Sequence, residues 1–333
     1  SIYSVEVEKA IQKEIKDIKP DLVYIIHFVN KLSPSVIRGA KKLGIPVILR
    51  LSDYFLLCPR FDFMYNKKPC EECLTKGYMS CIKKHCVKGS LFASAIRVFS
   101  MKVHQMMNIY EDIDAFITPS EYLKDKLIAN GFDEKKITCI PTFTASKSEV
   151  GEPCIGMYGL YFGRVTEEKG VDTVVKAYEM MPDRHVKIMG DDTTDEAKRL
   201  KDYIADKKIK NVEFVGFKAG EELEEIIKGA RFTLIPSIWY DNLPNTALES
   251  FQYSKPVIAS NIGSLPELIL DGVNGYLFKP GDPRELCEKI KLLDDDDLVK
   301  EMGSASRSRL EECFAPETHY DALLSIFNKV KNI

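Results

Sequence analysis

Two short segments in the C-terminal half of the chain combine residue types suited to binding an anion. The first is Tyr161-Phe-Gly-Arg-Val-Thr-Glu-Glu-Lys-Gly170, which lies at the turn from a predicted strand to a predicted helix. Gly163 allows the backbone to approach a ligand closely, and Arg164 and Lys169 supply two cations at the same turn. Cations in this place would stabilise a leaving group that gains negative charge. The segment therefore predicts a site for an anion such as a diphosphate.

The second segment, residues 236–260, adds two carboxylates to the start of a predicted helix. Asp241 lies in a polar loop after a strand, and Glu249 lies about one turn into the helix, where it can accept hydrogen bonds from sugar hydroxyls. The free amides and the dipole of a helix start favour an anion. The amides predicted to face that anion are those of Asn245, Thr246 and Ala247.

These segments require a scaffold of alternating strands and helices, and the chain has one. Short branched apolar runs such as residues 21–27 and 45–51 alternate with amphipathic helical patterns such as residues 4–18 and 33–44. The same alternation continues from residue 154 to residue 278. It predicts an α/β protein with two Rossmann-type, doubly wound parallel sheets that face each other across a ligand-binding cleft.

Length and composition agree with two globular domains. The chain has 333 residues, of which 45% are apolar and 29% charged. It contains no apolar run of about 18 residues and does not begin like a signal peptide, so we expect a cytoplasmic protein. Residues 142–152 are small, polar and unpatterned, which is typical of a linker.

Together the two anion-binding segments resemble the retaining glycosyltransferases of family four, which have the GT-B architecture of two Rossmann-like domains. The resemblance covers nearly the whole chain. Arg164 and Lys169 match that family's GRxxxxKG motif, and Asp241-x7-Glu249 is similar to its E-x7-E motif, with Asp in place of the first Glu. The resemblance implies that the two cations hold the diphosphate of a nucleotide-sugar, that Glu249 holds the ribose, and that Asp241 contacts the transferred sugar.

Further positions are assigned by the same resemblance. His27 would face the donor sugar from the end of a strand, and Phe217 would end the strand and loop that read the base. Leu243, which lies between Asp241 and Glu249 in the sequence, would belong to the donor site as well. Leu51-Ser-Asp-Tyr-Phe-Leu-Leu-Cys-Pro-Arg60 is close to the family's HDxWxxCPR segment, with Ser52 where His is usual. It makes Asp53 and Arg60 acceptor-side candidates.

The resemblance also implies a division of the chain. Family members begin with a further strand, a glycine-rich turn and helices, which would precede Ser1, so we expect either an incomplete chain or an abbreviated first domain. The expected parts are an acceptor-side domain over residues 1–141 with a Cys-rich basic insert at 58–88, the linker at 142–152, a donor domain over 153–315, and a C-terminal helix, 316–333, that packs back on the first domain.

Four cysteines in the insert form a C-x2-C-x7-C-x4-C pattern. Thiolates at this spacing can close a structural zinc site. Free thiols are about equally expected, whereas a cytoplasmic location disfavours disulfides. The cysteines are Cys70, Cys73, Cys81 and Cys86.

Charge is distributed unevenly along the chain. Residues 1–145 hold 22 basic and 16 acidic side chains, although the whole chain has a net charge of -3. Residues 58–102 hold nine basic and three acidic side chains, a pattern that suits binding to an anionic surface such as lipid headgroups. A face that is simply exposed to solvent would explain the pattern as well. The apolar and basic helix predicted near residues 90–110 fits either the inner surface of a membrane or a half-buried core position.

The resemblance implies a metal-independent hexosyltransferase of cell-surface polysaccharide biosynthesis. It would move a sugar from a nucleotide-diphosphate-sugar to a hydroxyl of a glycan or lipid-linked acceptor, with retained configuration. Two alternatives stay open: a nucleotide-sugar-binding protein without catalysis, and a GT-B sugar-nucleotide epimerase. Nucleic acid is not an expected partner, because the basic segment matches no recognised module.

Overall fold

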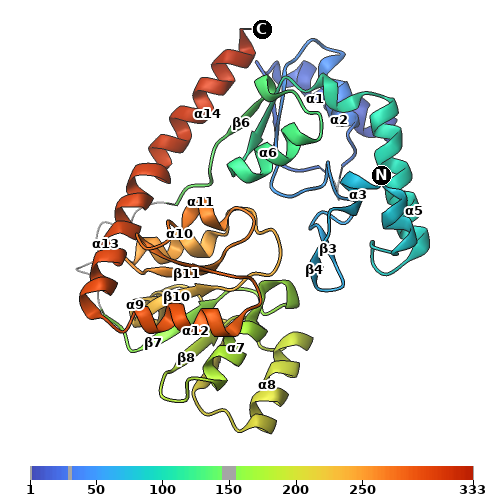
Figure 1. Ribbon diagram of the computed structural model, residues 1–333. Helices are drawn as coiled ribbons and strands as arrows, with labels where there is room; N and C mark the ends of the chain where they lie inside the picture. The colour runs from blue at the N-terminus through green and yellow to red at the C-terminus, as the bar shows by residue number, and fades with distance from the viewer. Residues whose placement is uncertain (1, 29–31, 145–154, 333) are drawn as a thin grey trace. The chain divides into compact units, whose positions relative to one another are not determined.

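The computed structural model describes residues 2–28, 32–144 and 155–332. They form two compact units (Figure 1). The N-terminal unit comprises Ser1–Pro141 together with His319–Ile333, and the C-terminal unit comprises Thr142–Thr318. Most of the predicted linker, residues 145–152, lies outside the described residues.

The N-terminal unit is built on a four-stranded parallel sheet in the order β1-β2-β5-β6. Its strands are short apolar runs, because a parallel sheet is covered on both faces. The strands of this unit are β1 (Val23–Ile25), β2 (Val47–Arg50), β3 (Met64–Tyr65), β4 (Lys68–Pro69), β5 (Ala115–Thr118) and β6 (Ile137–Cys139). The helices are α1 (Val5–Ile18), α2 (Ser35–Lys41), α3 (Glu72–Thr75), α4 (Met79–Lys83), α5 (Leu91–Met106), η1 (Ile109–Asp112), α6 (Glu121–Ala129) and η2 (Glu134–Lys136).

The last helix of the chain, α14 (Pro316–Lys331), covers one face of this sheet. Val330 is buried in a cluster with Ile48 and Ile117, and Phe327 meets the ring of Tyr24 edge-on at 5.4 Å between centroids. Residues from the end of the chain therefore complete the core of the N-terminal unit.

The C-terminal unit contains a six-stranded parallel sheet in the order β12-β11-β10-β7-β8-β9. The strands are β7 (Tyr158–Phe162), β8 (Val186–Met189), β9 (Val212–Gly216), β10 (Ala230–Ile235), β11 (Val257–Ser260) and β12 (Gly275–Phe278). The helices are η3 (Glu167–Lys169), α7 (Val171–Glu179), α8 (Asp195–Lys207), α9 (Glu221–Lys228), α10 (Asn245–Gln252), α11 (Leu265–Leu268), α12 (Pro283–Leu292) and α13 (Asp296–Cys313).

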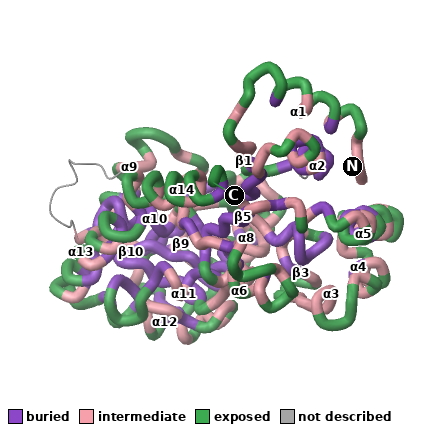
Figure 2. Tube along the Cα trace, turned by 90° about the horizontal axis from the view of Figure 1, so that it is seen from above, coloured by how far each residue is buried: buried purple, intermediate pink, exposed green. Residues whose placement is uncertain are grey.

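Helices cover both faces of this larger sheet. Successive strand residues point to opposite faces, so Tyr161 packs in one buried cluster with α7, α8 and α12, whereas Leu160 and Phe162 pack in another with α9. Figure 2 shows much of the inner strands in the buried colour and much of the outer helices in the exposed colour. The doubly wound parallel sheets predicted from the sequence are confirmed.

Candidate functional site

A pocket of about 560 Å³ lies at the carboxyl ends of β7, β8 and β9. The strand order reverses between β7 and β10, and α/β proteins bind ligands at such a switch point. Its lining residues follow these strands or belong to the helices after them: Phe162, Gly163, Arg164, Val165, Thr166, Met189, Gly190, Asp191, Thr194, Phe217, Lys218, Ala219, Gly220, Leu223, Thr246 and Glu249.

Five residues predicted from the sequence lie together in this pocket. Gly163 and Arg164 follow β7, Phe217 follows β9, and Thr246 and Glu249 belong to α10. The side chain of Arg164 is 65% exposed, and Phe217 is 75% exposed. The pocket therefore combines an exposed cation, an exposed aromatic ring, the start of a helix and a carboxylate, which are complementary to a phosphate, a base and a sugar hydroxyl.

The start of α10 offers fewer free amides than predicted. The amide of Ala247 donates to the carbonyl of Pro244 at 3.1 Å, which leaves Asn245 and Thr246 as the candidate donors. Asn245 is exposed and is not among the lining residues. The prediction of three free amides was wrong because the first turn tightens onto Pro244.

Leu243 has a structural position. Its φ of 58° lies in the left-handed region, its side chain is buried, and its amide donates to Ser264 Oγ at 2.7 Å. Ser264 Oγ in turn donates to the carbonyl of Asp241 at 2.8 Å. These bonds fix the loop that presents Asp241. Leu243 thus supports the loop, and its amide is already used.

Lys169 and Asp241 form a buried ion pair beside the pocket. Lys169 Nζ lies 2.6 Å from Asp241 Oδ2, and their side chains are 18% and 8% exposed. Ser237 Oγ donates to the same oxygen at 2.9 Å, and Lys169 lies over the ring of Trp239 at 5.2 Å. Neither charged residue is among the pocket-lining residues. The cation predicted for the diphosphate and the carboxylate predicted for the transferred sugar therefore contact each other as one ion pair.

Gly170 allows the turn with Lys169 to approach β10. Its φ is +69°, and a Cβ atom there would lie 2.0 Å from the carbonyl oxygen of Pro236. The backbones of the two segments that hold the ion pair are thus in direct contact. No side chain other than hydrogen fits between them.

Gly170→Ala is expected to lower the free energy of unfolding by about 3 kcal/mol, because it combines backbone strain with a clash against backbone. Gly272→Ala is the matched control, since Gly272 has a φ of +81° and open space around its Cβ position. It should cost only about 1 kcal/mol. Urea unfolding measures both values, and equal losses would contradict close packing at Gly170.

Glu249 lies partly buried in the wall of the pocket. Burial raises the pKa of its carboxyl group above the ordinary value, because the charged form loses hydration. Within the described residues, no hydrogen bond to this carboxylate is found. The free protein thus holds an acceptor group that is ready for donor hydroxyls.

Glu249→Gln is expected to raise the melting temperature of the ligand-free protein near pH 7.5. The folded-state pKa of Glu249 exceeds its unfolded value, so the wild-type protein loses stability as pH rises between the two values. The higher stability of the Gln variant should therefore vanish at pH values below the pKa that Glu249 has in the unfolded chain. Thermal melts across pH measure this difference, with Glu225→Gln on α9 as the exposed control. A destabilised Gln variant at neutral pH would contradict the assignment.

Several residues that shape the site were not predicted. A Cβ at Gly190, at the end of β8, would lie 2.0 Å from the carbonyl oxygen of Gly163. Its position directly after a predicted strand was the available signal. Ser237, Trp239 and Ser264 left no such signal, because their contacts depend on how the loop after β10 folds.

His27 and the acceptor-side candidates lie in the N-terminal unit. His27 is exposed after β1, with its ring 6.4 Å from that of Phe55. Asp53 Oδ1 accepts the amide of Phe55 at 2.9 Å, and burial raises the pKa of Asp53, with an opposing effect from His27. Arg60 is paired with Asp62 at 2.8 Å. His27 and Asp53 therefore lie near each other after neighbouring strands, whereas Arg60 is held by a local partner.

The four insert cysteines do not support the zinc prediction. The thiol of Cys81 is hydrogen-bonded with those of Cys73 and Cys86, and Lys84 Nζ donates to Cys70 Sγ at 3.7 Å. The bond with Cys73 and burial raise the pKa of Cys81 in the metal-free protein. Among the described residues, no three His, Cys, Asp or Glu side chains are grouped to hold a metal ion, and the described cysteines are free.

Comparisons with known proteins agree with this geometry. Residues 156–309, which contain all the pocket-lining residues, match the family model "Glycosyl transferases group 1". The uncharacterised glycosyltransferase MJ1178 of Methanocaldococcus jannaschii is 29% identical over 193 residues, covering 57% of this chain and 52% of that protein. The amylovoran biosynthesis glycosyltransferase AmsK of Erwinia amylovora is 28% identical over 182 residues, covering 51% of this chain and 44% of that protein.

A solved structure extends the likeness to both units. HepE of Anabaena, determined in complex with UDP, superposes with a TM-score of 0.72 at 17% identity, covering 97% of this chain and 82% of that one. The chain spans about half the length of the two curated relatives above. The chain therefore has the GT-B fold, and its residues 156–309 are similar to the glycosyl transferases group 1 family.

Proposed function

We propose that this protein is a retaining glycosyltransferase that uses a nucleotide-diphosphate-sugar as donor. The acceptor is a hydroxyl of a glycan or of a lipid-linked sugar in the synthesis of a surface polysaccharide. The observation that carries the proposal is the pocket after β7, β8 and β9, where Arg164, Phe217 and Glu249 converge within the region similar to the group 1 family.

Each part of the donor has a fitting group in this pocket. The exposed ring of Phe217 can stack on a base, and Glu249 can accept hydrogen bonds from ribose hydroxyls. Arg164 and the first amides of α10 suit the diphosphate. The UDP bound by HepE supports this class of donor.

The ion pair beside the pocket suits the leaving-group end of the donor. An ammonium has three N–H donors, so Lys169 can keep its bond with Asp241 and still reach a phosphate oxygen. Both bonds to the Asp241 carboxylate involve Oδ2, and no bond to Oδ1 is found in the described part of the chain. We assign Oδ1 to a hydroxyl of the donor sugar.

The transfer itself breaks the bond between the sugar carbon and the diphosphate oxygen. Electrons of that bond leave with the nucleoside diphosphate, whose new charge Arg164, Lys169 and the α10 amides stabilise. The acceptor hydroxyl forms the new bond on the same face of the sugar and gives its proton to the departing phosphate oxygen. These residues provide the charge stabilisation themselves, so the proposed reaction needs no divalent cation. His27 is the candidate that faces the donor sugar, and Asp53 and Arg60 are the acceptor-side candidates.

A thermal-shift screen of uridine, guanosine and adenosine diphosphates tests donor binding. A nucleotide at a hundredfold excess over its Kd should stabilise the protein by about 2.7 kcal/mol, which raises the melting temperature by roughly 5–10 °C. The corresponding nucleotide-sugars are then incubated with the protein and a mixture of glycan and lipid-linked acceptors, and nucleotide release and new glycosidic product are measured.

The outcomes separate the candidate functions. Acceptor-dependent nucleotide release with an unchanged anomeric configuration supports the proposal. Donor isomerisation without acceptor would replace it with an epimerase, and donor binding without any release would replace it with a binding protein. No stabilisation by any of the three nucleotides would overturn the donor site.

A further inference from the structure

Helix α5 buries Val98 and Met101 against the N-terminal unit, yet it also exposes several large apolar side chains. Phe92 is 75% exposed, Phe99 is 59% exposed and Met106 is 83% exposed. Ser94 and Ser100, in contrast, are buried. An amphipathic helix of a monomeric domain normally places its apolar side chains toward the core. The helix therefore carries, besides its buried apolar residues, a second set of apolar side chains that points away from the N-terminal unit.

The exposed residues form one continuous stripe. Alternating steps of four and three residues keep side chains on one side of a helix. The apolar stripe, as we call it, follows such steps along the whole 16-residue helix, a length of about 24 Å. Burying one side chain of this size is worth about 1.5–3 kcal/mol, so a partner would gain much by covering it. Its members are the exposed Phe92, Ile96, Phe99 and Met106 and the half-buried Val103.

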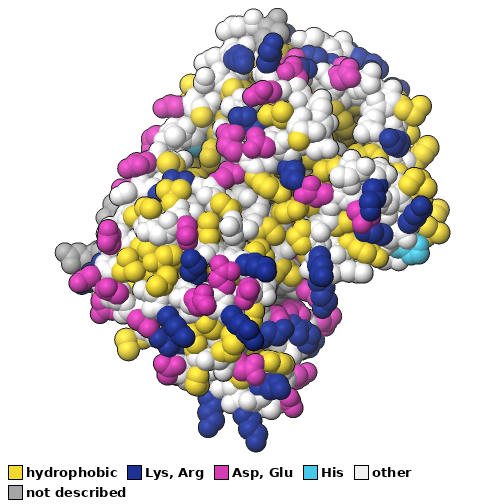
Figure 3. Space-filling model, in the orientation of Figure 1, with side chains coloured by type: hydrophobic (Ala, Val, Ile, Leu, Met, Phe, Trp, Pro, Cys, Tyr) yellow, Lys and Arg dark blue, Asp and Glu magenta, His cyan; other side chains and the backbone are white. Residues whose placement is uncertain are grey.

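The surroundings of the stripe are basic. Residues 73–110 contain no Asp or Glu and six Lys or Arg, of which Lys76 and Lys84 pair with Glu72 and Arg97 packs against Phe61. Lys88, which lies shortly before α5, and Lys102, in the last part of α5, are both exposed. Figure 3 shows hydrophobic and basic side chains intermixed along the side of the N-terminal unit where Figure 1 places α5. An occupant of this surface must accept apolar side chains and carry negative charge.

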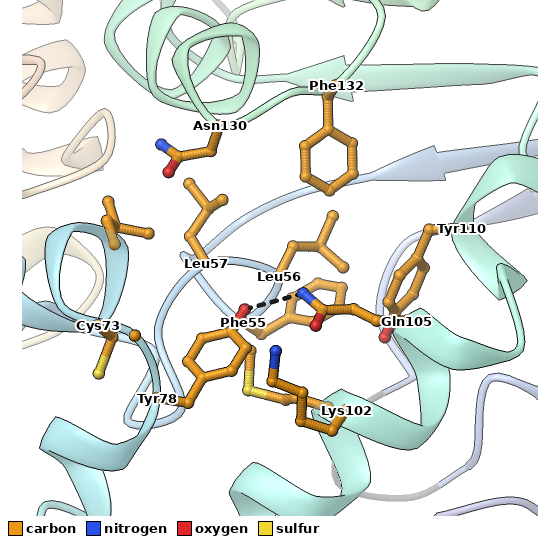
Figure 4. A pocket seen from close by; sticks show the side chains of 13 residues that line it. Phe55, Leu56, Leu57, Cys73, Tyr78, Lys102, Gln105, Tyr110, Asn130 and Phe132 are labelled. Atoms are coloured by element: carbon orange, nitrogen blue, oxygen red, sulfur yellow. Dashed lines mark hydrogen bonds between the residues drawn. The ribbon is translucent and has the colours of Figure 1, made fainter.

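A pocket of about 270 Å³ lies against the same helix (Figure 4). Phe55, Leu56 and Met101 give it apolar walls. Lys102 and Gln105 enter it from α5, where Lys102 Nζ lies 5.2 Å from the centre of the Tyr78 ring and Gln105 donates to Tyr78 Oη at 3.3 Å. An apolar pocket with a cation beside it matches an acyl or isoprenoid chain with a phosphate at its end.

These features distinguish among possible occupants. A second copy would bring two segments without any acidic residue against each other, which like-charge repulsion opposes. An anionic bilayer offers both an apolar layer for the stripe and phosphates for the lysines. None of the described helices is long and apolar enough to span a membrane.

We propose that α5 lies along the surface of a membrane containing anionic lipids, with the apolar stripe inserted at the acyl boundary and Lys88 and Lys102 near the phosphates. The lipid part of one acceptor molecule would then reach the pocket beside Tyr78. The surface contact does not depend on the proposed sugar transfer. Only the placement of the acceptor's lipid part in the pocket rests on the proposed sugar transfer.

Vesicle co-sedimentation of the full chain tests the contact without any donor. Wild-type protein should bind phosphatidylcholine vesicles that contain phosphatidylglycerol, and salt should weaken this binding. Phe92→Ser combined with Phe99→Ser should reduce binding at least tenfold, because two large apolar groups no longer insert. Lys88→Gln combined with Lys102→Gln should reduce the preference for phosphatidylglycerol by about tenfold.

The controls make each result decisive. Leu292→Ser removes an exposed apolar side chain from α12 of the other unit and should leave binding unchanged. Melting curves and nucleotide-induced shifts of the Phe variant should match wild type, because these side chains are exposed. Wild-type protein that binds no vesicle, or a Phe variant that binds like wild type, overturns the proposal. If sedimentation velocity shows a dimer for the wild-type protein and a monomer for the Phe variant, the stripe is instead an interface with a second copy of the chain.

Discussion

Replacing Lys169 with alanine is expected to lower the free energy of unfolding by about 3 kcal/mol and to abolish most sugar transfer. The loss of stability arises because Asp241 would be left as a buried carboxylate with only Ser237 as a donor. The loss of transfer arises because the departing diphosphate would lose a cation, which costs on the order of a hundredfold in kcat.

A double-mutant cycle separates the two effects. Asp241→Asn added to Lys169→Ala should recover most of the lost stability, because the buried group is then neutral and can still hydrogen-bond Ser237. Transfer should not recover, and the double variant should be about as inactive as each single one. Urea unfolding and nucleotide release measure the two readouts on the same samples.

An exposed pair provides the control for this cycle. Lys300 and Asp297 lie 3.8 Å apart on α13, with both side chains more than half exposed. Their coupling should stay below about 1 kcal/mol. A Lys169 variant that unfolds like wild type would contradict the structural part of the prediction, and a double variant with full transfer would contradict the catalytic part.

The Lys169–Asp241 pair also shows where sequence reasoning ends. The spacing within each segment predicted the loop after β7 and the loop after β10, and both lie at the same sheet edge because parallel strands end there. Contact between their side chains depends on backbone details such as the closeness of Gly170 to Pro236. A pattern of residue types does not encode a distance of that kind, so the contact between Lys169 and Asp241 was not predicted.

The same limit applies to the start of α10 and to helix α5. The sequence predicted where α10 begins, but the bond from Ala247 to Pro244 depends on the local tightening of its first turn. For α5, the apolar content fitted a membrane surface and a core position equally well. The burial of Val98 and Met101, and the exposure of Phe92, Phe99 and Met106, show that the helix divides its large side chains between the domain and the outside. Composition determines that a helix is amphipathic, whereas the tertiary fold determines which face is covered.

Replacing Arg164 with alanine is expected to weaken the binding of the matching nucleoside diphosphate by about tenfold to a hundredfold, without a change in stability. Hydrogen bonds from a cation to a phosphate contribute about 1.5–3 kcal/mol, which corresponds to this range. The side chain is 65% exposed and its ion pair with Glu168 is long, at 3.8 Å, so its removal should not affect folding. Titration calorimetry and thermal melts provide the two measurements.

The choice of ligand makes this prediction specific to the diphosphate. The corresponding nucleoside without phosphates should bind the Arg164→Ala variant and the wild type equally well, because it has no group for the guanidinium. Phe217→Ala should show the complementary result and weaken both ligands, since the exposed ring is assigned to the base. Arg284→Ala on α12 controls for the loss of an exposed arginine elsewhere in the unit. An Arg164 variant that loses affinity for the nucleoside as strongly as for the diphosphate would show that this side chain shapes the pocket and does not hold the phosphates.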